Sequence, residues 1–353
     1  MKRIWIDYMA PCDVFFFKSL LKERMNERKY EFYSTARIHA ETADLLKDNG
    51  IEAELIGKHD VSSSASQICS FIERNFKLAL HLPKFDVSLS LANIYGIIVS
   101  KLRLRPSISI IDNDLIEYER TLMEKIAAKV HARADWIIAP AAYPVDLTIS
   151  KGANPEKVFT FNGYKEDIYI ADYEPDPNFL KKIPFEDFVV IRPEALYSTY
   201  VHEGVSMTGA LLDKFSKENT NVIYLPRERQ DLEYLRSVKD RSKIWMPPKP
   251  LNGLDLVFHS KAILTGSGTF AREAACMGKT AISFFPDKLL AVDKRLVEEG
   301  GMFHSRDVDV IVEYVLSRFN TTAAPTFEKS KKAKTEFLKI LLEILEEEVN
   351  KND

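Results

Sequence analysis

Cysteine is scarce in this sequence. It contains three, Cys12, Cys69 and Cys276, and no two of them form a C-x-x-C pair. An odd number of thiols cannot all pair within one chain, and small secreted domains held together by disulfides usually carry an even set. We therefore expect reduced cysteines and an intracellular protein.

Long apolar runs are also lacking. No uninterrupted apolar stretch reaches the roughly 20 residues that a membrane-spanning helix needs. No apolar signal core precedes the strand-like run Arg3–Ile6. These absences predict a cytoplasmic protein without a transmembrane segment.

An excess of charge of either sign is missing as well. Lys and Arg number 49, Asp and Glu number 52, and the formal net charge is −3. Proteins that bind nucleic acid usually show a marked positive excess, so we expect no nucleic-acid partner. The composition, with 46% hydrophobic and 29% charged residues, is instead typical of a globular protein.

Short apolar runs alternate with segments of helical periodicity along the chain. This alternation predicts parallel sheets covered by helices on both faces. The 353 residues exceed what one core usually holds, which favours two domains. A charged stretch with Pro175, Pro177 and Pro184 interrupts the alternation and predicts a linker. We expect an N-terminal Rossmann-like domain (1–165), a linker (166–184), a C-terminal Rossmann-like domain (185–325) and a last amphipathic helix (326–353).

The most informative segment is Leu264–Lys279, which predicts a strand, a glycine turn, a helix and a glycine stop. Gly266 and Gly268 allow the backbone to turn sharply and to approach a ligand closely. Ser267 and Thr269 are residue types that favour a helix N-terminus, where free N–H groups and the helix dipole attract an anion such as a diphosphate. An ordinary capped helix fits the same spacing. A P-loop does not, because the G-K-[ST] ending is absent.

With its G-S-G-T turn and early glutamate, this segment resembles the nucleotide-sugar site of GT-B glycosyltransferases and of the non-hydrolysing UDP-N-acetylglucosamine 2-epimerases. The resemblance implies that the turn around Gly266 holds the diphosphate and that Glu273 holds the ribose. The positions it carries over for nucleotide-sugar binding are Ser267, Gly268, Thr269 and Glu273, and Gly266 of the same turn completes the predicted site.

The whole chain also resembles a mostly archaeal family of uncharacterised proteins related to those enzymes. The matching pieces are Ile4–Asp7, Thr35–Arg37, Ile56–His59, Asn162–Glu166 and Ile191–Glu194. The resemblance implies an α/β protein with two Rossmann-like domains facing a cleft, the GT-B architecture, whose last helix packs back on the first domain. It further implies a homodimer, no bound metal and no cofactor beyond the nucleotide sugar, which is UDP-linked in the epimerases.

The sequence departs from the epimerases at three places. Ile191 replaces the histidine of their His-Arg-x-Glu-Asn run, Ile111–Asp114 stands where they have His-Val-Glu-Ala-Gly, and Asp7–Pro11 replaces their Gly-Thr-Arg-Pro-Glu turn. These departures disfavour epimerisation by their mechanism and favour glycosyl transfer.

Two arginines directly follow predicted strands of the second half. Arg192 follows Phe188–Ile191, and Arg227 follows Val222–Pro226. Carboxyl ends of strands face the ligand in open α/β sheets, where arginine can clamp a diphosphate. Ordinary ion pairs are the alternative. We predict diphosphate contacts for both arginines, and the match to the Arg-x-Glu run adds Glu194 to the nucleotide-sugar site.

Candidate catalytic groups lie in the first half. Asp7 ends an apolar strand, where a carboxylate could act as general base. His59 lies in a predicted loop, where an imidazole could transfer protons. Asp13 is interpreted rather as a helix cap, and His202, in a predicted loop at the start of the second domain, is the alternative histidine. Asp112–Asp114 lacks a complete set of metal ligands and predicts a turn.

These residues together predict a GT-B-like glycosyltransferase that moves a sugar from a nucleotide sugar to an unknown acceptor, with Asp7 or His59 as base. Two alternatives stay open: an epimerase or hydrolase that acts on the nucleotide sugar alone, and a non-catalytic subunit that binds it.

Overall fold

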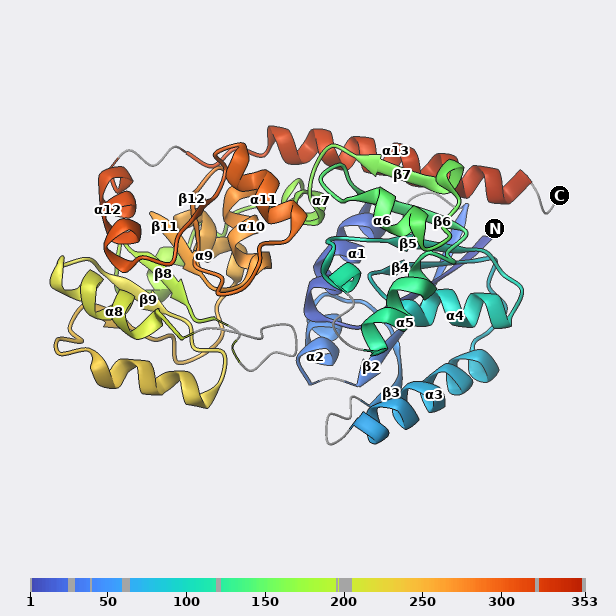
Figure 1. The fold of residues 1–353 in the computed structure, drawn as a ribbon, viewed down its shortest axis with the longest axis horizontal. Helices are drawn as coiled ribbons and strands as arrows, with labels where there is room; N and C mark the ends of the chain where they lie inside the picture. The colour runs from blue at the N-terminus through green and yellow to red at the C-terminus, as the bar shows by residue number, and fades with distance from the viewer. Residues whose placement is uncertain are drawn as a thin grey trace. The chain divides into compact units, whose positions relative to one another are not determined.

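The chain folds into two compact units (Figure 1). The computed structural model describes residues 2–24, 29–38, 40–58, 64–118, 122–194, 196, 205–320 and 324–350. Unit 1 comprises Met1–Tyr169 and Ala333–Asp353, and unit 2 comprises Ile170–Lys332. Each unit contains one parallel sheet, which we call sheet 1 and sheet 2.

Sheet 1 has seven described strands in the order β3-β2-β1-β4-β5-β6-β7. The central strand carries apolar side chains at consecutive positions, as in Ile4, Trp5 and Ile6, because helices bury both of its faces. From β1 the chain adds strands β2 and β3 on one side, and it then returns to add β4 to β7 on the other side. The pair β1 and β4 is therefore the switch point of the sheet. The strands are β1 (Lys2–Tyr8), β2 (Tyr30–Ile38), β3 (Glu54–Lys58), β4 (Val87–Leu91), β5 (Ser107–Ile110), β6 (Trp136–Pro140) and β7 (Val158–Phe161).

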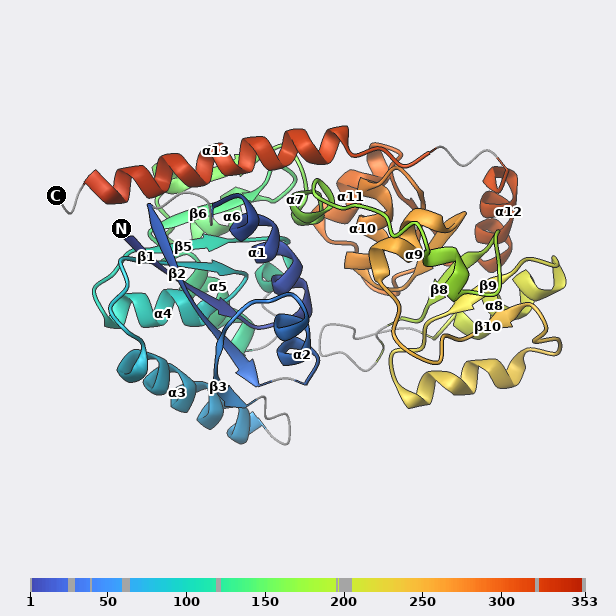
Figure 2. The same ribbon diagram turned by 180° about the vertical axis from the view of Figure 1, so that it is seen from behind.

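Helices α1, α2 and α13 cover one face of sheet 1, and α3 to α6 cover the other (Figures 1 and 2). The terminal helix α13 is held by an aromatic cluster in which Phe337 meets Phe16 of α1 and Phe161 of β7, with ring centroids 5.7 and 5.3 Å apart. The helical elements are α1 (Pro11–Arg24), α2 (Ala40–Asp48), α3 (Ser64–His81), α4 (Ile94–Leu102), η1 (Leu115–Tyr118), α5 (Leu122–His131), α6 (Val145–Ser150), η2 (Pro155–Lys157) and α13 (Glu328–Asn350).

Sheet 2 has six described strands in the order β10-β9-β8-β11-β12-β13, with its switch point between β8 and β11. Its core joins the sheet to α8 and α12 through buried residues such as Val189, Leu211, Phe215 and Ile311. The strands are β8 (Val189–Arg192), β9 (Val222–Tyr224), β10 (Ile244–Trp245), β11 (Ala262–Thr265), β12 (Thr280–Ser283) and β13 (Phe303–His304).

The helices of unit 2 follow the same pattern. Residues 229–237, which have helical periodicity in the sequence, form a 3-10 helix, and a capping box with Glu228 and Asp231 fixes its start. The helical elements are α7 (Lys165–Ile170), which crosses from unit 1, η3 (Phe179–Lys182), α8 (Thr208–Lys217), η4 (Arg229–Ser237), α9 (Gly253–His259), α10 (Gly268–Cys276), α11 (Ala291–Glu298) and α12 (Val308–Arg318).

The prediction of an α/β protein built from two Rossmann-like sheets is confirmed. None of the described helices is long and apolar enough to cross a membrane. Cys12, Cys69 and Cys276, all among the described residues, form no disulfide.

Candidate functional site

The switch point of sheet 2 brings together most of the residues that the sequence assigns to nucleotide-sugar binding. Strands β8 and β11 pair so that Arg192 lies beside Thr265. The Gly266 N–H donates to the Arg192 carbonyl at 3.3 Å. Arg192 and Glu194 therefore lie against the turn that contains Gly266, Ser267 and Gly268. In open α/β sheets this crevice, at the carboxyl ends of the strands beside the reversal, is where ligands bind.

Gly266 is required by a close approach of two backbones. A Cβ at this position would lie 2.5 Å from the Glu194 Cα and 2.4 Å from its Cγ. No other residue type fits without displacing the end of β8. The glycine is therefore explained first by packing at the switch point.

The N-terminus of α10 is open to an anion. Ser267 takes the N-cap position in extended conformation, with φ −133°, and its side chain makes no capping hydrogen bond. The Ser267 hydroxyl therefore accepts no hydrogen bond from the N–H groups of the first helical turn. These N–H groups point out of the helix toward the crevice. Ser267, Gly268 and Thr269 are each partly exposed. Such an end can hold a diphosphate.

Behind this turn, a buried ion pair fixes the helix. Arg272 is 4% exposed and its Nη1 donates to Asp293 of α11 at 2.9 Å. A Cβ at Gly268 would lie 2.4 Å from the same Nη1. Gly268 thus leaves room for the guanidinium, and Arg272 holds α10 against α11. Glu273, one residue further, is partly exposed.

Glu194 is buried, and its carboxylate is hydrogen-bonded by other groups of the protein. Its carboxylate accepts hydrogen bonds from the Ser206 hydroxyl, the Met207 N–H and the Thr208 hydroxyl, at 2.7 to 2.8 Å, which fixes the start of α8. Arg306 donates to it at 2.9 Å. These four donors occupy both oxygens. A direct contact of Glu194 with the nucleotide sugar stays a prediction that this geometry disfavours.

Arg227 also lies at this edge of the sheet. Its Nε donates to the Pro193 carbonyl at 3.0 Å, and its N–H donates to Asp231 at 2.7 Å. The guanidinium is thereby directed toward the end of β8. Contacts of Arg192, Arg227 and Glu273 with a ligand remain predictions.

Sequence reasoning missed Arg306 in this crevice. Its guanidinium donates to Glu194, to the Phe284 carbonyl at 2.6 Å and to the Val205 carbonyl at 2.5 Å. It is 30% exposed. The sequence contained a signal for it, because Arg306 follows the short strand β13 as Arg227 follows β9, and Arg192 ends β8. Three arginines therefore lie at the carboxyl ends of strands of sheet 2.

At the switch point of sheet 1, Asp7 forms a buried ion pair with Arg74 of α3. Both side chains are 1% exposed, and the guanidinium donates to the two carboxylate oxygens at 2.7 and 2.9 Å. Thr35 and Asn93 donate to the same carboxylate at 2.7 and 2.9 Å. A general base needs a free lone pair directed at the substrate. The catalytic role of Asp7 stays a prediction that this geometry disfavours.

Asp13 is a buried carboxylate at the other side of the first strand–helix turn. It is 3% exposed at the first turn of α1 and accepts from the Met9 and Ala10 N–H groups at 2.7 and 3.0 Å. Burial raises the pKa of its carboxyl to about 6, while these hydrogen bonds and the charge of Lys165 act in the opposite direction. Because α1 begins at Pro11, Asp13 lies inside the first turn and not at the N-cap before Val14 that the sequence suggests. Its pKa approaches neutrality.

Lys165 lies near Asp13 and is 4% exposed. Its Nζ donates to Asp112 at 2.7 Å and lies 3.7 Å from Glu166. Asn113 accepts from the Leu115 N–H at 2.9 Å, so the Asp112–Asp114 segment forms the turn that the sequence predicts. Among the described residues, no group of three His, Cys, Asp or Glu side chains has the arrangement of a metal site.

Two histidines that the sequence proposes, His59 and His202, lie outside the described residues. Their roles stay predictions.

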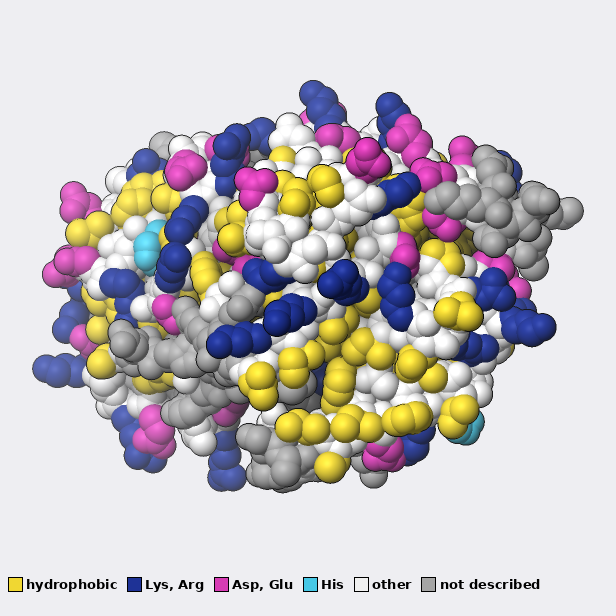
Figure 3. Space-filling view, turned by 45° about the vertical axis from the view of Figure 1, so that its right-hand side comes forward, with side chains coloured by type: hydrophobic (Ala, Val, Ile, Leu, Met, Phe, Trp, Pro, Cys, Tyr) yellow, Lys and Arg dark blue, Asp and Glu magenta, His cyan; other side chains and the backbone are white. Residues whose placement is uncertain are grey.

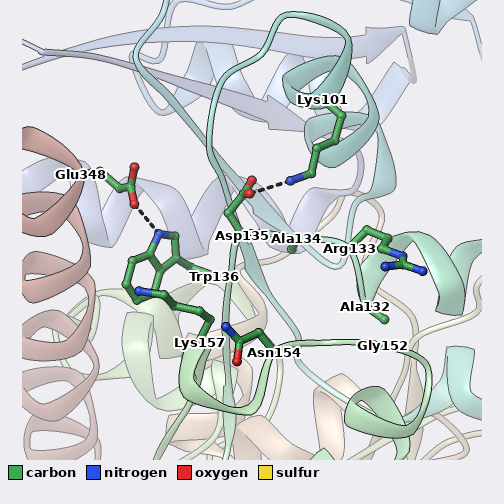
Figure 4. Close-up of a pocket in the computed structure, with 10 residues that line it drawn as sticks. All are labelled: Lys101, Ala132, Arg133, Ala134, Asp135, Trp136, Gly152, Asn154, Lys157 and Glu348. Atoms are coloured by element: carbon green, nitrogen blue, oxygen red, sulfur yellow. Dashed lines mark hydrogen bonds and ion pairs between the residues drawn. The ribbon is translucent and has the colours of Figure 1, made fainter. Parts of the chain in front are cut away.

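A pocket of about 700 Å³ lies at the opposite edge of sheet 1 (Figure 4). Asp135 immediately precedes β6 and accepts from the N–H and hydroxyl of Ser107, the first residue of β5, so this is the amino-terminal edge. In it, Lys101 contacts Asp135 at 2.5 Å, and Glu348 accepts from the Trp136 indole at 2.9 Å. Ligands of open α/β sheets bind at the other edge. We therefore assign this pocket no part in the site.

Comparison with known proteins identifies a family and a relative of this chain. The model of a family described as proteins of unknown function, DUF354, matches residues 2–349. An uncharacterized protein of Methanocaldococcus jannaschii is 26% identical over 330 residues, which cover 88% of this chain and 90% of the relative.

Solved structures share the fold. The UDP-GlcNAc 2-epimerase of Neisseria meningitidis, solved with UDP-GlcNAc bound, superposes with a TM-score of 0.75 at 14% identity, over 97% of this chain and all of the epimerase chain. The glycotransferase of kitacinnamycin gives a TM-score of 0.59 at 11% identity, over 98% and 99% of the two chains. The architecture is therefore that of the GT-B fold.

Proposed function

The chain belongs to the DUF354 family of proteins of unknown function, and on this premise we propose that it is a nucleotide-sugar-dependent glycosyltransferase. Unit 2 binds the donor at the switch point of sheet 2. Unit 1 holds the acceptor at the carboxyl edge of sheet 1. The donor is a nucleoside diphosphate sugar, with UDP as the first nucleotide to test, and neither a metal ion nor a further cofactor takes part.

The observation that carries this proposal is the open N-terminus of α10 beside Arg192. A diphosphate there would receive hydrogen bonds from the N–H groups that follow Ser267, and the positive end of the helix dipole would favour its charge. Arg192 and Arg227 add positive charge from the neighbouring strand ends. Glu273, one turn into α10, contacts the ribose hydroxyls. The leaving nucleotide is thus stabilised mainly by electrostatics.

In unit 1, Asp13 is the base that we propose for the acceptor hydroxyl. With a pKa raised to about 6, it is ionised at neutral pH and still basic enough to accept a proton. It replaces Asp7 in this role, because Asp7 is committed to Arg74. Lys165, close by, stabilises the ionised form of Asp13.

A thermal-shift screen of nucleotides and nucleotide sugars tests the donor site, because a ligand that binds only the folded protein raises its Tm. We expect one class of nucleotide sugar to raise the Tm. Glu273→Ala and Arg192→Ala should abolish most of the shift without lowering the Tm of the free protein.

Glu298→Ala is the matched control, since Glu298 is an exposed glutamate of the neighbouring helix α11. It should bind like the wild type. If no nucleotide sugar shifts the Tm at millimolar concentration, or if Glu273→Ala binds unchanged, the proposed donor site is wrong.

An epimerase is the second candidate, because epimerases are among the proteins with this fold. Ile191 argues against it: the side chain is fully buried in β8 and has no group that transfers protons. Incubation with the identified donor alone distinguishes the two. Release or rearrangement of the sugar without an acceptor would favour an epimerase or hydrolase. Binding without turnover under any condition would favour a non-catalytic subunit.

A further inference from the structure

Helix α5 presents a mixed row of basic and large apolar side chains to solvent. Residues three, four or seven positions apart share one side of a helix. On one side of α5 such positions carry exposed residues, of which the last lies in the turn that ends the helix. We call them the α5 face: Leu122, Lys125, Ile126, Lys129 and Arg133. Helix α5 lies on the viewer's side of unit 1 in Figure 1, and Figure 3 shows Lys and Arg side chains gathered beside hydrophobic ones on this side.

The opposite side of α5 fixes this orientation. Ala128 and His131 are buried, and the His131 ring lies 3.2 Å from the Ser109 hydroxyl of β5. The helix is anchored on sheet 1 through that side, so it cannot turn Leu122 and Ile126 inward. These two side chains are 72 and 39% exposed.

The three bases of the α5 face are not neutralised within the protein. In the part of the chain that the structure describes, Lys125, Lys129 and Arg133 take part in no ion pair. The carboxylate that follows them, Asp135, contacts Lys101 instead, at 2.5 Å. Figure 4 shows the Arg133 guanidinium apart from that pair.

Few acids lie near these bases. Glu124 is the acid of α5, and its distance of two residues from Leu122 places it about 200° around the helix, away from the α5 face. The neighbouring helix α6 contributes one exposed acid, Asp146. Three bases thus face solvent with one exposed acid on the adjoining helix.

The turn between α4 and β5 adds to this surface at the C-terminal end of α5. Asp135 binds this turn, because it accepts from the Ser107 N–H and hydroxyl, each at 2.9 Å. Leu102 and Leu104 of the turn are 61 and 91% exposed. Leu104 has φ +54°, a conformation that leucine rarely adopts. Arg105 follows it, partly exposed and without an ion pair among the described residues.

We propose that the α5 face and the turn after α4 dock unit 1 on a membrane surface that contains anionic phospholipids. The ammonium and guanidinium groups lie at the level of the lipid phosphates, and the leucine and isoleucine side chains enter the boundary between headgroups and acyl chains. The contact is peripheral, since none of the described helices is long and apolar enough to cross a bilayer.

The mixture of side chains favours a lipid surface over other anionic partners. Nucleic acid would use the bases of this surface, but it would leave Leu104 and Leu122 uncovered, and the chain as a whole has a net charge of −3. The buried centre of a protein interface is depleted of lysine, whereas Lys125 and Lys129 stand in the middle of the α5 face. A membrane interface accommodates both kinds of side chain in one row.

Sedimentation of the full chain with lipid vesicles tests the proposal. We expect binding to vesicles made of equal parts of phosphatidylcholine and phosphatidylglycerol, little binding to phosphatidylcholine alone, and weaker binding as salt is added. Each lysine at an anionic surface strengthens binding by about fivefold. Lys125→Glu with Lys129→Glu removes two such charges and adds repulsion, so it should lower the partition coefficient by at least about 25-fold.

The matched control changes the net charge by the same amount elsewhere. Lys329 and Lys332 are exposed on α13 and make no ion pair among the described residues. Lys329→Glu with Lys332→Glu should bind the anionic vesicles within about twofold of the wild type, because membrane attraction falls off within a Debye length.

A second pair of changes tests the insertion of apolar side chains. Leu122→Ser with Leu104→Asn, where asparagine tolerates the positive φ, should lower the partition coefficient by about tenfold and leave its salt dependence in place. Leu232→Ser with Val310→Ser, at exposed positions of unit 2, should have no effect. The far-UV circular dichroism of every variant should match that of the wild type, since the substituted side chains are exposed.

A wild type that does not sediment with the anionic vesicles at low salt overturns the proposal. So does binding that the two lysine pairs weaken equally, or binding that Leu122→Ser with Leu104→Asn leaves unchanged. A chain that ignores vesicles and binds duplex DNA through Lys125 and Lys129 would show a nucleic-acid partner in their place. The proposal does not depend on the glycosyltransferase function, because sedimentation is measured without any sugar donor.

Discussion

Asp7 and Arg74, 67 residues apart in the chain, form a bidentate ion pair in which both side chains are 1% exposed. The pair joins the end of β1 to α3 below the carboxyl edge of sheet 1. Gly57 makes room for it, because a Cβ there would lie 2.8 Å from the Arg74 Cδ. Arg74 also stacks over the Tyr95 ring, 4.5 Å from its centroid. This network explains why a carboxylate stands at the end of an apolar strand.

Loss of either partner should strongly destabilise the protein. We expect Arg74→Met or Asp7→Ala to lower the free energy of unfolding by about 3–5 kcal/mol, because each leaves the other charge buried without a partner. Urea unfolding measures the change. As the control, Lys101→Met removes the exposed ion pair with Asp135 and should cost at most about 1 kcal/mol. A stable Asp7→Asn variant that has lost turnover would instead support the catalytic role of Asp7.

Gly266→Ala should disrupt the donor site by displacing the end of β8. The added Cβ would lie 2.5 Å from the Glu194 Cα, a backbone atom that cannot move without its strand. We expect a lower Tm and, in a binding titration, at least about a tenfold loss of nucleotide-sugar affinity. Gly253→Ala at the start of α9 is the matched control, because its Cβ would find the nearest atom at 3.8 Å. Equal behaviour of the two variants would refute this account of Gly266.

The rate of glycosyl transfer should depend on the ionisation of Asp13. Because burial raises the pKa of this carboxyl to about 6, the base form dominates above pH 6 and is lost below it. We expect kcat/KM to rise with pH through about 6 in the wild type. Asp13→Asn should lose this limb and about 10²- to 10⁴-fold in rate. An unchanged pH profile in Asp13→Asn would eliminate it as the base.

His131 should make the protein sensitive to acid. It is fully buried beside the Ser109 hydroxyl, at 3.2 Å, and burial lowers its pKa from 6.5 to about 4. The unfolded chain then binds a proton more readily than the folded one, so this contribution to stability is complete above pH 6.5 and is lost as the pH falls toward 4. Relative to His131→Gln, the wild type should lose about 2–3 kcal/mol of unfolding free energy between pH 7.5 and pH 4.5. Urea unfolding at both pH values checks this, and a difference that does not change with pH would contradict it.

Local patterns were sufficient for the architecture. The alternation of buried strands and helices predicted the two parallel sheets, since a strand covered on both faces is apolar at consecutive positions, as in Ile4 to Ile6. The α10 segment was also readable, because a strand, Gly266-x-Gly268 and a helix are consecutive in the chain. The arginines at strand ends followed from the rule that carboxyl ends of parallel strands lie on one edge.

The roles of individual charged residues depended on distant partners. Asp7 has the local context of a base, and nothing within β1 indicates Arg74. Glu194 stands beside Arg192 in the crevice, yet it serves Arg306, 112 residues away, and the start of α8. The raised pKa of Asp13 likewise results from burial that no local pattern reports.

The sequence by itself determined the two α/β sheets and the turn at Gly266, because hydrophobic periodicity and backbone geometry act over a few neighbouring residues. Only the tertiary structure decided which carboxylates are neutralised by an ion pair and which have a pKa raised toward neutrality. Ion pairing and burial depend on residues that meet only after the chain has folded.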